Sequence, residues 1–418
     1  MKKIILSLFL ILSVSLFSQE TLNTMFYNVF KFPNSLPQNR QLILKDILDE
    51  YQPDLFMICE LVSENGADLI LNTSLQSQPD KFARALFIAD STNLDDPLQT
   101  MVFYNTRKLT LVNQQKIPTV YRDINQYSFQ LNITSNDTIR LEVFVAHLKS
   151  STGPANRQIR LEMVQEVTKS LKKLTRPNTY VLFAGDFNFY NSSEPAYQEI
   201  LNPTNAILMI DPLNASGNWQ NNAAFSYLHT QSTRVSNVGF GSGTNAGASG
   251  GLDDRFDFIM ISENFKNSTR LSYINESYKA YGNNGDCLDK DVKDPNCTGI
   301  YSQTLRTNLY NMSDHLPVVM QFKIHENLNT KTFESKPFIW LQSSNITSDK
   351  IMIGIDKTRL NAQNNMLFIY NSIGQFVQSV RINNQSSITI DCQGLAPGIY
   401  YIKSKESNEI LKFIKKSF

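Results

Sequence analysis

The stretch that decides the fold is YVLFAGDFN, residues 180–188. Its first five residues are apolar or aromatic, which is typical of a strand buried on both faces. Asp186 and Asn188 follow two positions apart, and on an extended chain their side chains would face the same way. Gly185 has no Cβ, so another chain or a substrate can approach closely there. Because a buried, unpaired carboxylate is costly, this stretch predicts a polar site at the end of a core strand.

Four other strand-like runs begin or end in polar residues, DLFMICE, VFVAH, RFDFIMI and SDHLPVVM, and a fifth, MFYNVF, carries one among apolar neighbours. Their polar residues are Asn28, Glu60, His147, Asp257, Asp314 and His315. Six strands that each buried a charge separately would be unstable. We therefore expect these strand ends to gather at one edge of the molecule, where the side chains satisfy one another and a cation.

The order of elements predicts the fold class. Strand pairs joined by turns alternate with a few helix-like stretches, such as residues 42–50 and 156–174. This pattern favours an α+β fold, a four-layer α/β sandwich in which two packed mixed β-sheets are flanked by helices. Residues 100–105 and 108–112 are predicted as two strands around a turn. Residues 237–251, rich in Gly, Ser and Asn, are predicted as a mobile loop.

The chain divides into four segments by composition. Residues 1–18 combine two lysines with a short apolar run and are predicted to be a secretory signal peptide, with an N-terminal anchor helix as the alternative. Residues 19–325 form the predicted catalytic domain, and 326–339 a polar linker. Residues 340–418 read as a small all-β sandwich of short strands between Gly, Asn and Pro turns. No other stretch is long and apolar enough to span a membrane.

Charge and ligand type narrow the chemistry. Residues 19–330 hold 26 basic and 32 acidic residues, a net charge of −6, which argues against a tight, non-specific grip on long nucleic acid. Four residues, Asn28, Glu60, Asp186 and Asp314, offer hard oxygen ligands, which suit Mg²⁺, with Mn²⁺ or Ca²⁺ as alternatives, rather than zinc. Oxygen-bound metal beside imidazole and carboxylate suits phosphoester hydrolysis.

Six short motifs in order carry a family resemblance. They are FYNVF, PDLFMICE, AHLKS, GDFN, RFDFI and SDHLP. Together they resemble the motif set of the endonuclease/exonuclease/phosphatase family, over about residues 22–324. That family includes pancreatic-type deoxyribonucleases, abasic-site endonucleases, sphingomyelinases and inositol-polyphosphate phosphatases. The resemblance implies that Glu60 is the principal metal ligand, with Asn28 beside it and Asp314 completing the site. It also implies that Asp186 positions and activates the attacking water.

The resemblance implies a phosphate-binding side of the site as well. Asn188 would hold the scissile phosphate, and Arg122, in YRDINQYSF, matches a position where some members place a phosphate-binding Arg. His315 would contact a phosphoryl oxygen and be oriented by Asp257. His147 would lie across the phosphate.

The tail carries a second resemblance. NSIGQFV (371–377), GLAPGIYYIKSK (394–405) and the basic strand ILKFIKKSF resemble the C-terminal sorting domain of type IX secretion substrates. This implies export by the Sec route, passage through the outer membrane by the type IX machinery, and removal of the domain. The alternative is a small sandwich that binds carbohydrate or protein.

These observations predict a secreted or cell-surface, Mg²⁺-dependent phosphoesterase, a nuclease or related phosphodiesterase acting as a monomer on a phosphoester such as nucleic acid. A lipid or inositol phosphate phosphoesterase is the alternative within this class. A catalytically silent secreted binding protein on the same scaffold is the alternative outside it.

Several residues stay ambiguous in the sequence. Cys287 and Cys297 flank a polar loop and either form a disulfide after export or remain free. His229 and Arg234 either line the cleft or hydrogen-bond within a loop. Asp253 and Asp254 are expected to be solvated or to support the site from outside it.

Overall fold

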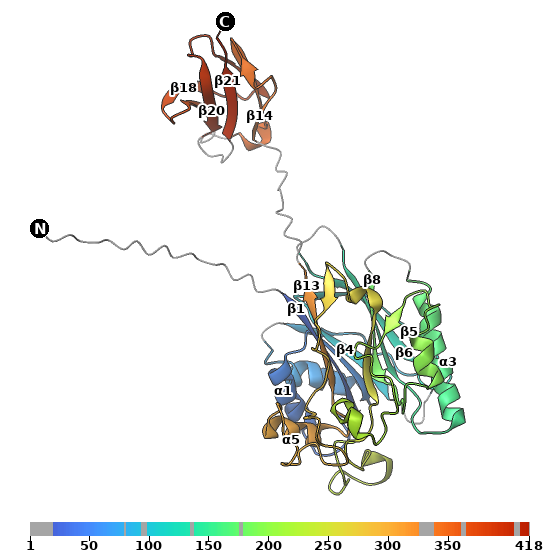
Figure 1. Cartoon of the computed structure of the whole chain (residues 1–418). Coiled ribbons are helices and arrows are strands. Elements are labelled where there is room, and N and C mark those ends of the chain that lie inside the picture. Colours follow the sequence, from blue (N-terminus) through green and yellow to red (C-terminus); the bar gives the residue numbers. More distant parts are fainter. Residues whose placement is uncertain are drawn as a thin grey trace, which may run out of the picture. The chain divides into compact units, whose positions relative to one another are not determined.

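The computed structural model describes residues 20–78, 81–92, 98–133, 138–174, 179–325, 338–360, 365–404 and 410–417. They fall into two compact units, Met1–Asn327 and Leu328–Phe418 (Figure 1). The predicted signal peptide and most of the predicted linker lie outside the described residues. Within the described ranges, no helix has the length and apolar character needed to cross a membrane.

The first unit contains a seven-stranded mixed sheet. Its central strands β1 and β2 are parallel, whereas β13 and β4 flank them in antiparallel directions. The strand order is β11 (Leu271–Tyr273), β13 (Val318–Ile324), β1 (Thr21–Phe32), β2 (Leu55–Leu61), β4 (Gln99–Asn105) and β3 (Phe82–Arg84), with β12 (Lys279–Ala280) also on β13.

A six-stranded mixed sheet forms the other half of this unit. Its order is β5 (Leu109–Ile117), β6 (Ile124–Leu131), β7 (Arg140–His147), β8 (Thr179–Asp186), β10 (Asp257–Ser262) and β9 (Met209–Ile210). Strands β7 and β8 are parallel, with His147 beside Asp186, and β10 runs antiparallel to β8, with Asp257 beside Asp186. This register alone brings three polar strand ends to one edge.

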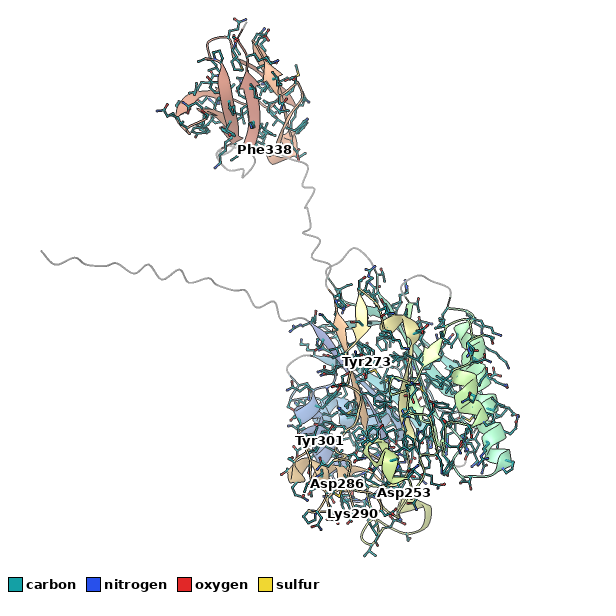
Figure 2. All side chains as sticks on the ribbon, viewed as in Figure 1. Asp253, Tyr273, Asp286, Lys290, Tyr301 and Phe338 are labelled. Atoms are coloured by element: carbon teal, nitrogen blue, oxygen red, sulfur yellow. A yellow bond between two sulfur atoms is a disulfide. The ribbon has the colours of Figure 1, made fainter. Side chains whose placement is uncertain are left out.

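The two sheets pack face to face, and side chains fill the space between them (Figure 2). Helices α1 (Arg40–Tyr51) and α5 (Gln303–Met312) lie on one side, and α3 (Pro154–Leu171) on the opposite side, in Figure 1. The side chains of α3 and of α4 (Pro195–Ile200) form a second core against the outer face of the six-stranded sheet. The fold is therefore the predicted four-layer α+β sandwich. The short helices are α2 (Glu64–Leu69), η1 (Ile70–Ser74), η2 (Ala223–Leu228), η3 (Gly243–Asn245) and η4 (Glu263–Phe265).

Two local features go beyond what the sequence predicted. Strands β4 and β5 follow one another around a turn, as predicted, and they belong to different sheets, β4 to the seven-stranded sheet and β5 to the six-stranded one. Helix α5 was not predicted, since its sequence QTLRTNLYNM is mostly polar. Its buried face is carried by Leu305, Leu309 and Met312, and the Ser302 hydroxyl caps it by accepting a hydrogen bond from the Leu305 N–H.

The second unit is all-β, as predicted, and has a hydrophobic core of its own. One sheet has three strands and the other has five. The strands are β14 (Ile339–Leu341), β15 (Ile346–Thr347), β16 (Lys350–Ile355), β17 (Met366–Asn371), β18 (Phe376–Arg381), β19 (Ser387–Asp391), β20 (Gly398–Ser404) and β21 (Ile410–Lys415), with a short helix η5 (Lys357–Arg359).

Candidate active site

One cluster of polar side chains joins the two sheets across the core. The Nδ2 atom of Asn28, on β1, donates to Glu60 Oε1 at 2.9 Å and to Asp186 Oδ2 at 3.1 Å. The Nε2 atom of His147, at the end of β7, lies 3.6 Å from Asp186 Oδ2 and 3.9 Å from Glu60 Oε1. All four residues are buried. Groups from β1, β2, β7 and β8, far apart in the sequence, therefore meet at one point.

Asn28 contributes its nitrogen, rather than its oxygen, to this cluster. Its Oδ1 atom accepts a hydrogen bond from the Phe30 N–H at 3.0 Å. In this orientation, Asn28 holds Glu60 and Asp186 together as a hydrogen-bond donor. Its predicted role as a metal ligand would need the amide oxygen to turn toward the two carboxylates.

A second cluster adjoins the first through Asp186. His315 Nδ1 lies 2.7 Å from Asp257 Oδ2, and His315 Nε2 lies 3.7 Å from Asp186 Oδ2. The Nε2 atom of Gln231 lies 2.5 Å from the same imidazole nitrogen. Which of these two nitrogens donates depends on the tautomer of the imidazole. The backbone N–H of Asp257 donates to the Thr230 hydroxyl at 3.2 Å.

Burial and mutual repulsion set the charge states of these groups. Burial, followed by the nearby Asp314 carboxylate, raises the pKa of Glu60. Burial also raises the pKa of Asp186 to about 8. Burial lowers the pKa of His147 well below its usual value, and the Arg122 cation adds to this effect. Burial alone would lower the pKa of His315, but Asp257 and Asp186 raise it well above the usual range.

Asp314 is held by the glycine-rich loop of residues 237–251. The N–H of Ala248 donates to Asp314 Oδ2 at 2.6 Å. Gly247 has a φ of +80°, and a Cβ there would lie 2.9 Å from the same carboxylate oxygen. Only glycine fits this conformation and this approach without displacement. The loop thus packs directly against a predicted metal ligand.

Arg122 supplies a positive group near the first cluster. It is buried, and its Nε and Nη1 atoms have no hydrogen-bond partner among the described residues. Its charge affects the pKa values of both His147 and Glu60, which places it near the first cluster. Two buried guanidinium nitrogens without an acceptor are costly, so this side chain is suited to bind an anion.

The stretch GDFN differs from its expected geometry. Strand β8 ends at Asp186, and Asn188 has a left-handed backbone with a φ of +53°, so the expectation of an extended chain there was wrong. The Nδ2 atom of Asn188 lies 3.4 Å from the Leu148 carbonyl oxygen. A Cβ on Gly185 would meet the Ala146 carbonyl oxygen at 2.4 Å, so the neighbour that needs this glycine is strand β7.

His229 and Arg234, whose roles the sequence left open, are both buried and hydrogen-bonded to backbone carbonyl groups. His229 Nε2 contacts the Trp219 carbonyl oxygen at 2.7 Å, and Arg234 Nε donates to the Tyr310 carbonyl oxygen at 2.9 Å. Asp253 and Asp254 are half-buried rather than fully solvated, and burial raises their pKa values to about 6 and about 7.

Sequence reasoning missed two supporting residues, Gln231 and Arg40. The buried Arg40 guanidinium, from α1, donates to the carbonyl oxygens of Val29 at 3.0 Å and Phe30 at 2.6 Å, and also to that of Met312. It therefore ties the segment after Asn28 to the end of α5, just before the SDHLP motif. Neither residue belongs to a motif, and the only signal for Arg40 was a cation at the start of an amphipathic helix.

The donor set fits a divalent cation. Glu60 and Asp186 bring two carboxylates together in a buried site, and within the described ranges they and His147 form one of the groups able to hold a metal ion. Burial is the main cause of the raised pKa of both acids, and His315 opposes it in each case. Carboxylate oxygens are the ligands that Mg²⁺, Mn²⁺ and Ca²⁺ prefer.

Comparison with known proteins gives two kinds of similarity. Solved structures similar to this chain include the human Nocturnin catalytic domain with bound sulfate (17% identity, 73% of this chain and 94% of that chain, TM-score 0.47). They also include an endonuclease/exonuclease/phosphatase family protein from Bacteroides thetaiotaomicron (16% identity, 72% of this chain and 98% of that chain, TM-score 0.43). A mannosyl-6-phosphatase from the same species is similar as well (14% identity, 72% of this chain and 99% of that chain, TM-score 0.44). No curated protein matches. Residues 345–416 match the family model described as the secretion system C-terminal sorting domain. The second unit is therefore a secretion sorting domain of the type IX kind, which supports secretion or a cell-surface location.

Proposed function

We propose that residues 19–325 form a divalent-metal-dependent phosphoesterase of the endonuclease/exonuclease/phosphatase type. The observation that carries this proposal is the pairing of opposite charges in one buried site. Glu60 and Asp186 bring two carboxylates together beside His147, and Arg122 and His315 supply positive groups near them. A cation bound to a phosphate group satisfies both halves at once.

Each residue then has a distinct role. Glu60 and Asp314 would hold the metal, with Asn28 either as a third ligand or as the donor that aligns Glu60. When bound, Mg²⁺ or Mn²⁺ supplies Lewis-acid polarisation of a phosphoryl oxygen. Asp186 orients the attacking water and accepts its proton.

The phosphate side acts by electrostatic stabilisation. His315, kept cationic and oriented by Asp257, donates to a phosphoryl oxygen on which charge grows in the transition state. Arg122 and Asn188 hold the other phosphoryl oxygens in place. His147, which burial keeps neutral, lies across the same group and donates one N–H to it.

The test is hydrolysis of bis-p-nitrophenyl phosphate with Mg²⁺, with and without EDTA. Asp186→Ala and His315→Ala should each lower kcat by roughly 10²–10⁴-fold, since each removes an interaction needed in the transition state. Lys169→Gln, on the exposed face of α3, is the matched control and should leave kcat unchanged. The wild type failing to show EDTA-sensitive turnover would favour a silent binding protein, and near wild-type kcat in either alanine variant would refute the assigned role.

The substrate is proposed to be a nucleic acid or another phosphodiester. Parallel assays on double-stranded DNA, RNA, sphingomyelin and inositol phosphates separate this proposal from a lipid or inositol phosphate phosphoesterase. The net charge of −6 over residues 19–330 predicts that any DNA cleavage weakens with salt less steeply than in a basic nuclease.

Export is proposed to begin with cleavage of a signal peptide near residue 18 and to end with loss of the sorting domain, leaving a monomer. Intact-mass measurement of the secreted protein tests both cleavages. A mass that still includes residues 1–18 would contradict the signal-peptide assignment.

A further inference from the structure

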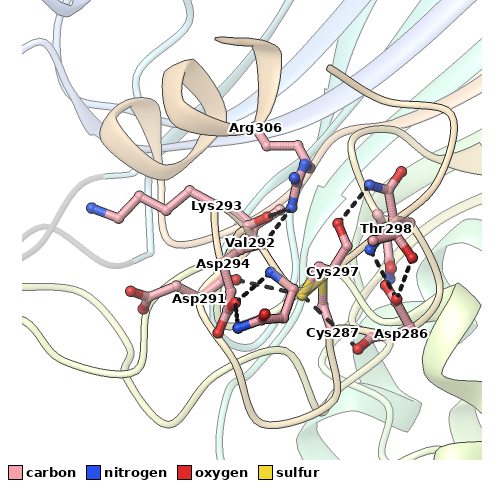
Figure 3. Close-up of a disulfide and its surroundings, with 12 residues drawn as sticks. Asp286, Cys287, Asp291, Val292, Lys293, Asp294, Cys297, Thr298 and Arg306 are labelled. Carbon is pink, nitrogen blue, oxygen red and sulfur yellow. Dashed lines mark hydrogen bonds between the residues drawn. A yellow bond between two sulfur atoms is a disulfide. The ribbon is translucent and has the colours of Figure 1, made fainter. Parts of the chain in front are cut away.

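A disulfide between Cys287 and Cys297 closes a loop of ten residues' separation on the first unit (Figure 3). The ends of this disulfide loop are joined again by the Thr298 N–H, which donates to Asp286 Oδ2 at 2.9 Å. From α5, the Arg306 Nη1 atom donates to the carbonyl oxygens of Val292 and Asp294, both at 2.9 Å. Both sulfur-bearing residues are buried. The disulfide and these hydrogen bonds therefore attach the loop firmly to the rest of the first unit.

The disulfide loop hydrogen-bonds to the segment of residues 230–235, which we call the strap. The Val292 N–H donates to the Thr233 carbonyl oxygen at 2.9 Å. The Val235 N–H donates to Asp291 Oδ1 at 2.6 Å. Two bonds from one edge of the loop thus position the strap.

The same loop also holds the chain that leads into β10. The Leu252 N–H donates to the Lys290 carbonyl oxygen at 3.2 Å, and the Asp289 N–H donates to the Leu252 carbonyl oxygen at 3.1 Å. Asp253, the next residue, and Lys290 lie near one another in Figure 2. Gly251 adds a close approach, since a Cβ there would lie 2.3 Å from the backbone of Asp289.

The strap in turn lies along the SDHLP motif. The Leu316 N–H donates to the Thr230 carbonyl oxygen at 2.7 Å, and the Thr233 N–H donates to the Asp314 carbonyl oxygen at 3.0 Å. The Thr233 hydroxyl donates to the Ser313 carbonyl oxygen at 2.6 Å. These bonds flank Asp314 and His315 on both sides, and Gln231 contacts the His315 imidazole between them.

We propose that the disulfide loop is a brace that holds the strap, and through it Gln231, Asp314 and His315, in catalytic position, so that the oxidised pair is required for full activity. This inference rests on the proposed function. Two thiols become the disulfide by passing two electrons and two protons to a disulfide-class oxidant, which becomes a pair of thiols. Such oxidants act outside the cytoplasm. The protein would therefore gain full activity only after export, and Gln231 is a positioning residue for His315.

The main experiment compares the oxidised full chain with the double variant Cys287→Ser, Cys297→Ser. Two readouts are taken: steady-state hydrolysis of bis-p-nitrophenyl phosphate, and amide hydrogen exchange of peptides covering residues 230–235 and 313–316. We expect kcat to fall at least roughly tenfold with KM changed by less than about threefold, because small misplacements cost this much. We also expect exchange in both peptides to become at least about tenfold faster. Active-site titration with Mn²⁺ normalises kcat to the folded fraction.

Further experiments keep the test valid even if the double cysteine variant does not fold. Asp291→Ala keeps the disulfide and removes one bond to the strap, so it should shift both readouts in the same direction by a smaller factor. Asn296 lies on the same loop and is exposed, and among the described residues its side chain bonds to Asp294, so Asn296→Ala should change neither readout. Treatment with a phosphine, which takes an oxygen atom from water as its two electrons reduce the disulfide, should convert the wild type to the behaviour of the double variant.

Each outcome decides. A double variant with kcat and exchange within about twofold of the wild type overturns the brace. Phosphine that lowers the activity of the double variant as well shows an effect unrelated to the disulfide and also counts against it. If the oxidised wild type has no metal-dependent turnover, the proposed function fails. In that case the exchange comparison alone decides whether the loop holds the strap.

Discussion

Replacing Asp254 with Asn should stabilise the first unit in a way that depends on pH. Asp254 is half-buried, and its Oδ1 atom has no hydrogen-bond partner among the described residues. Burial, then repulsion by Asp253, raises its pKa from 3.8 to about 7, although His315 opposes the shift. A side chain of the same shape without a charge removes this penalty and leaves the backbone, which accepts hydrogen bonds from Thr230 and Gln231, unchanged.

The sign and size of the change in unfolding free energy caused by Asp254→Asn follow from proton linkage. Between about pH 4 and pH 7 the unfolded chain has lost the Asp254 proton while the folded chain retains it, so the unfolding free energy of the wild type falls as pH rises. A shift of about three pKa units corresponds to about 4 kcal/mol. Because the carboxyl is partly exposed, we halve this to about 2 kcal/mol. The advantage of Asp254→Asn should therefore be absent below pH 4, grow to pH 7 and stay constant above it.

The assay is urea unfolding at half-unit steps from pH 4 to pH 9, in EDTA, with the disulfide intact. The chain has two tryptophans, and Trp340→Phe in every variant leaves the buried Trp219 to report on the first unit alone. Asp253→Asn is the graded control: its pKa of about 6 predicts a smaller gain that levels off one pH unit lower. A difference between Asp254→Asn and wild type that stays flat within about 0.5 kcal/mol from pH 4 to pH 9 would refute the reasoning.

Three further results are expected. In the wild type, Arg160 Nε and Nη2 lie 2.9 and 2.8 Å from the Glu194 carboxylate. Glu194→Ala leaves the buried Arg160 charge without its partner, so the free energy of unfolding in urea should fall by about 3–5 kcal/mol. A fall below about 1 kcal/mol would contradict this. Gly247→Ala should displace the Asp314 carboxylate and weaken Mn²⁺ binding, measured by calorimetry, at least roughly tenfold. The control is Gly239→Ala, where φ is also positive but no atom lies within 4 Å, and it should cost only about 1 kcal/mol of stability. Equal Mn²⁺ affinities in the two variants would disprove the role of the contact between Gly247 and Asp314. Finally, Mn²⁺ at about 100 times its Kd should raise the unfolding free energy by about 2.7 kcal/mol, and no rise would exclude a folded-state site.

The sequence predicted the features that depend on local pattern. Alternation and apolar runs identified the strands that carry Asn28, Glu60, His147, Asp186 and Asp257, because strand period and burial are encoded within a few residues. The gathering of these ends could be inferred as well, since buried charges need partners. Their register could not be, as it depends on which strands pair across the sheet.

The features that were missed depend on contacts between distant segments. Nothing near Arg40 indicates that its guanidinium will bind the carbonyl group of Met312, 272 positions away. Gln231 contacts His315 only because the strap pairs with the SDHLP motif. The orientation of the Asn28 amide is likewise set by Phe30 and by two carboxylates from other strands. These side-chain contacts are determined by tertiary packing, which overrides the local conformational preference of the sequence.

The two units have separate hydrophobic cores, and every residue of the candidate site belongs to the first. Maturation that trims the sorting domain would therefore remove no residue of the candidate site. Once the disulfide between Cys287 and Cys297 has formed, the precursor and the mature protein should then show the same activity per mole. Activity measured in cell fractions would then report where the oxidised protein is, and only the mass of the protein would report whether the sorting domain has been removed.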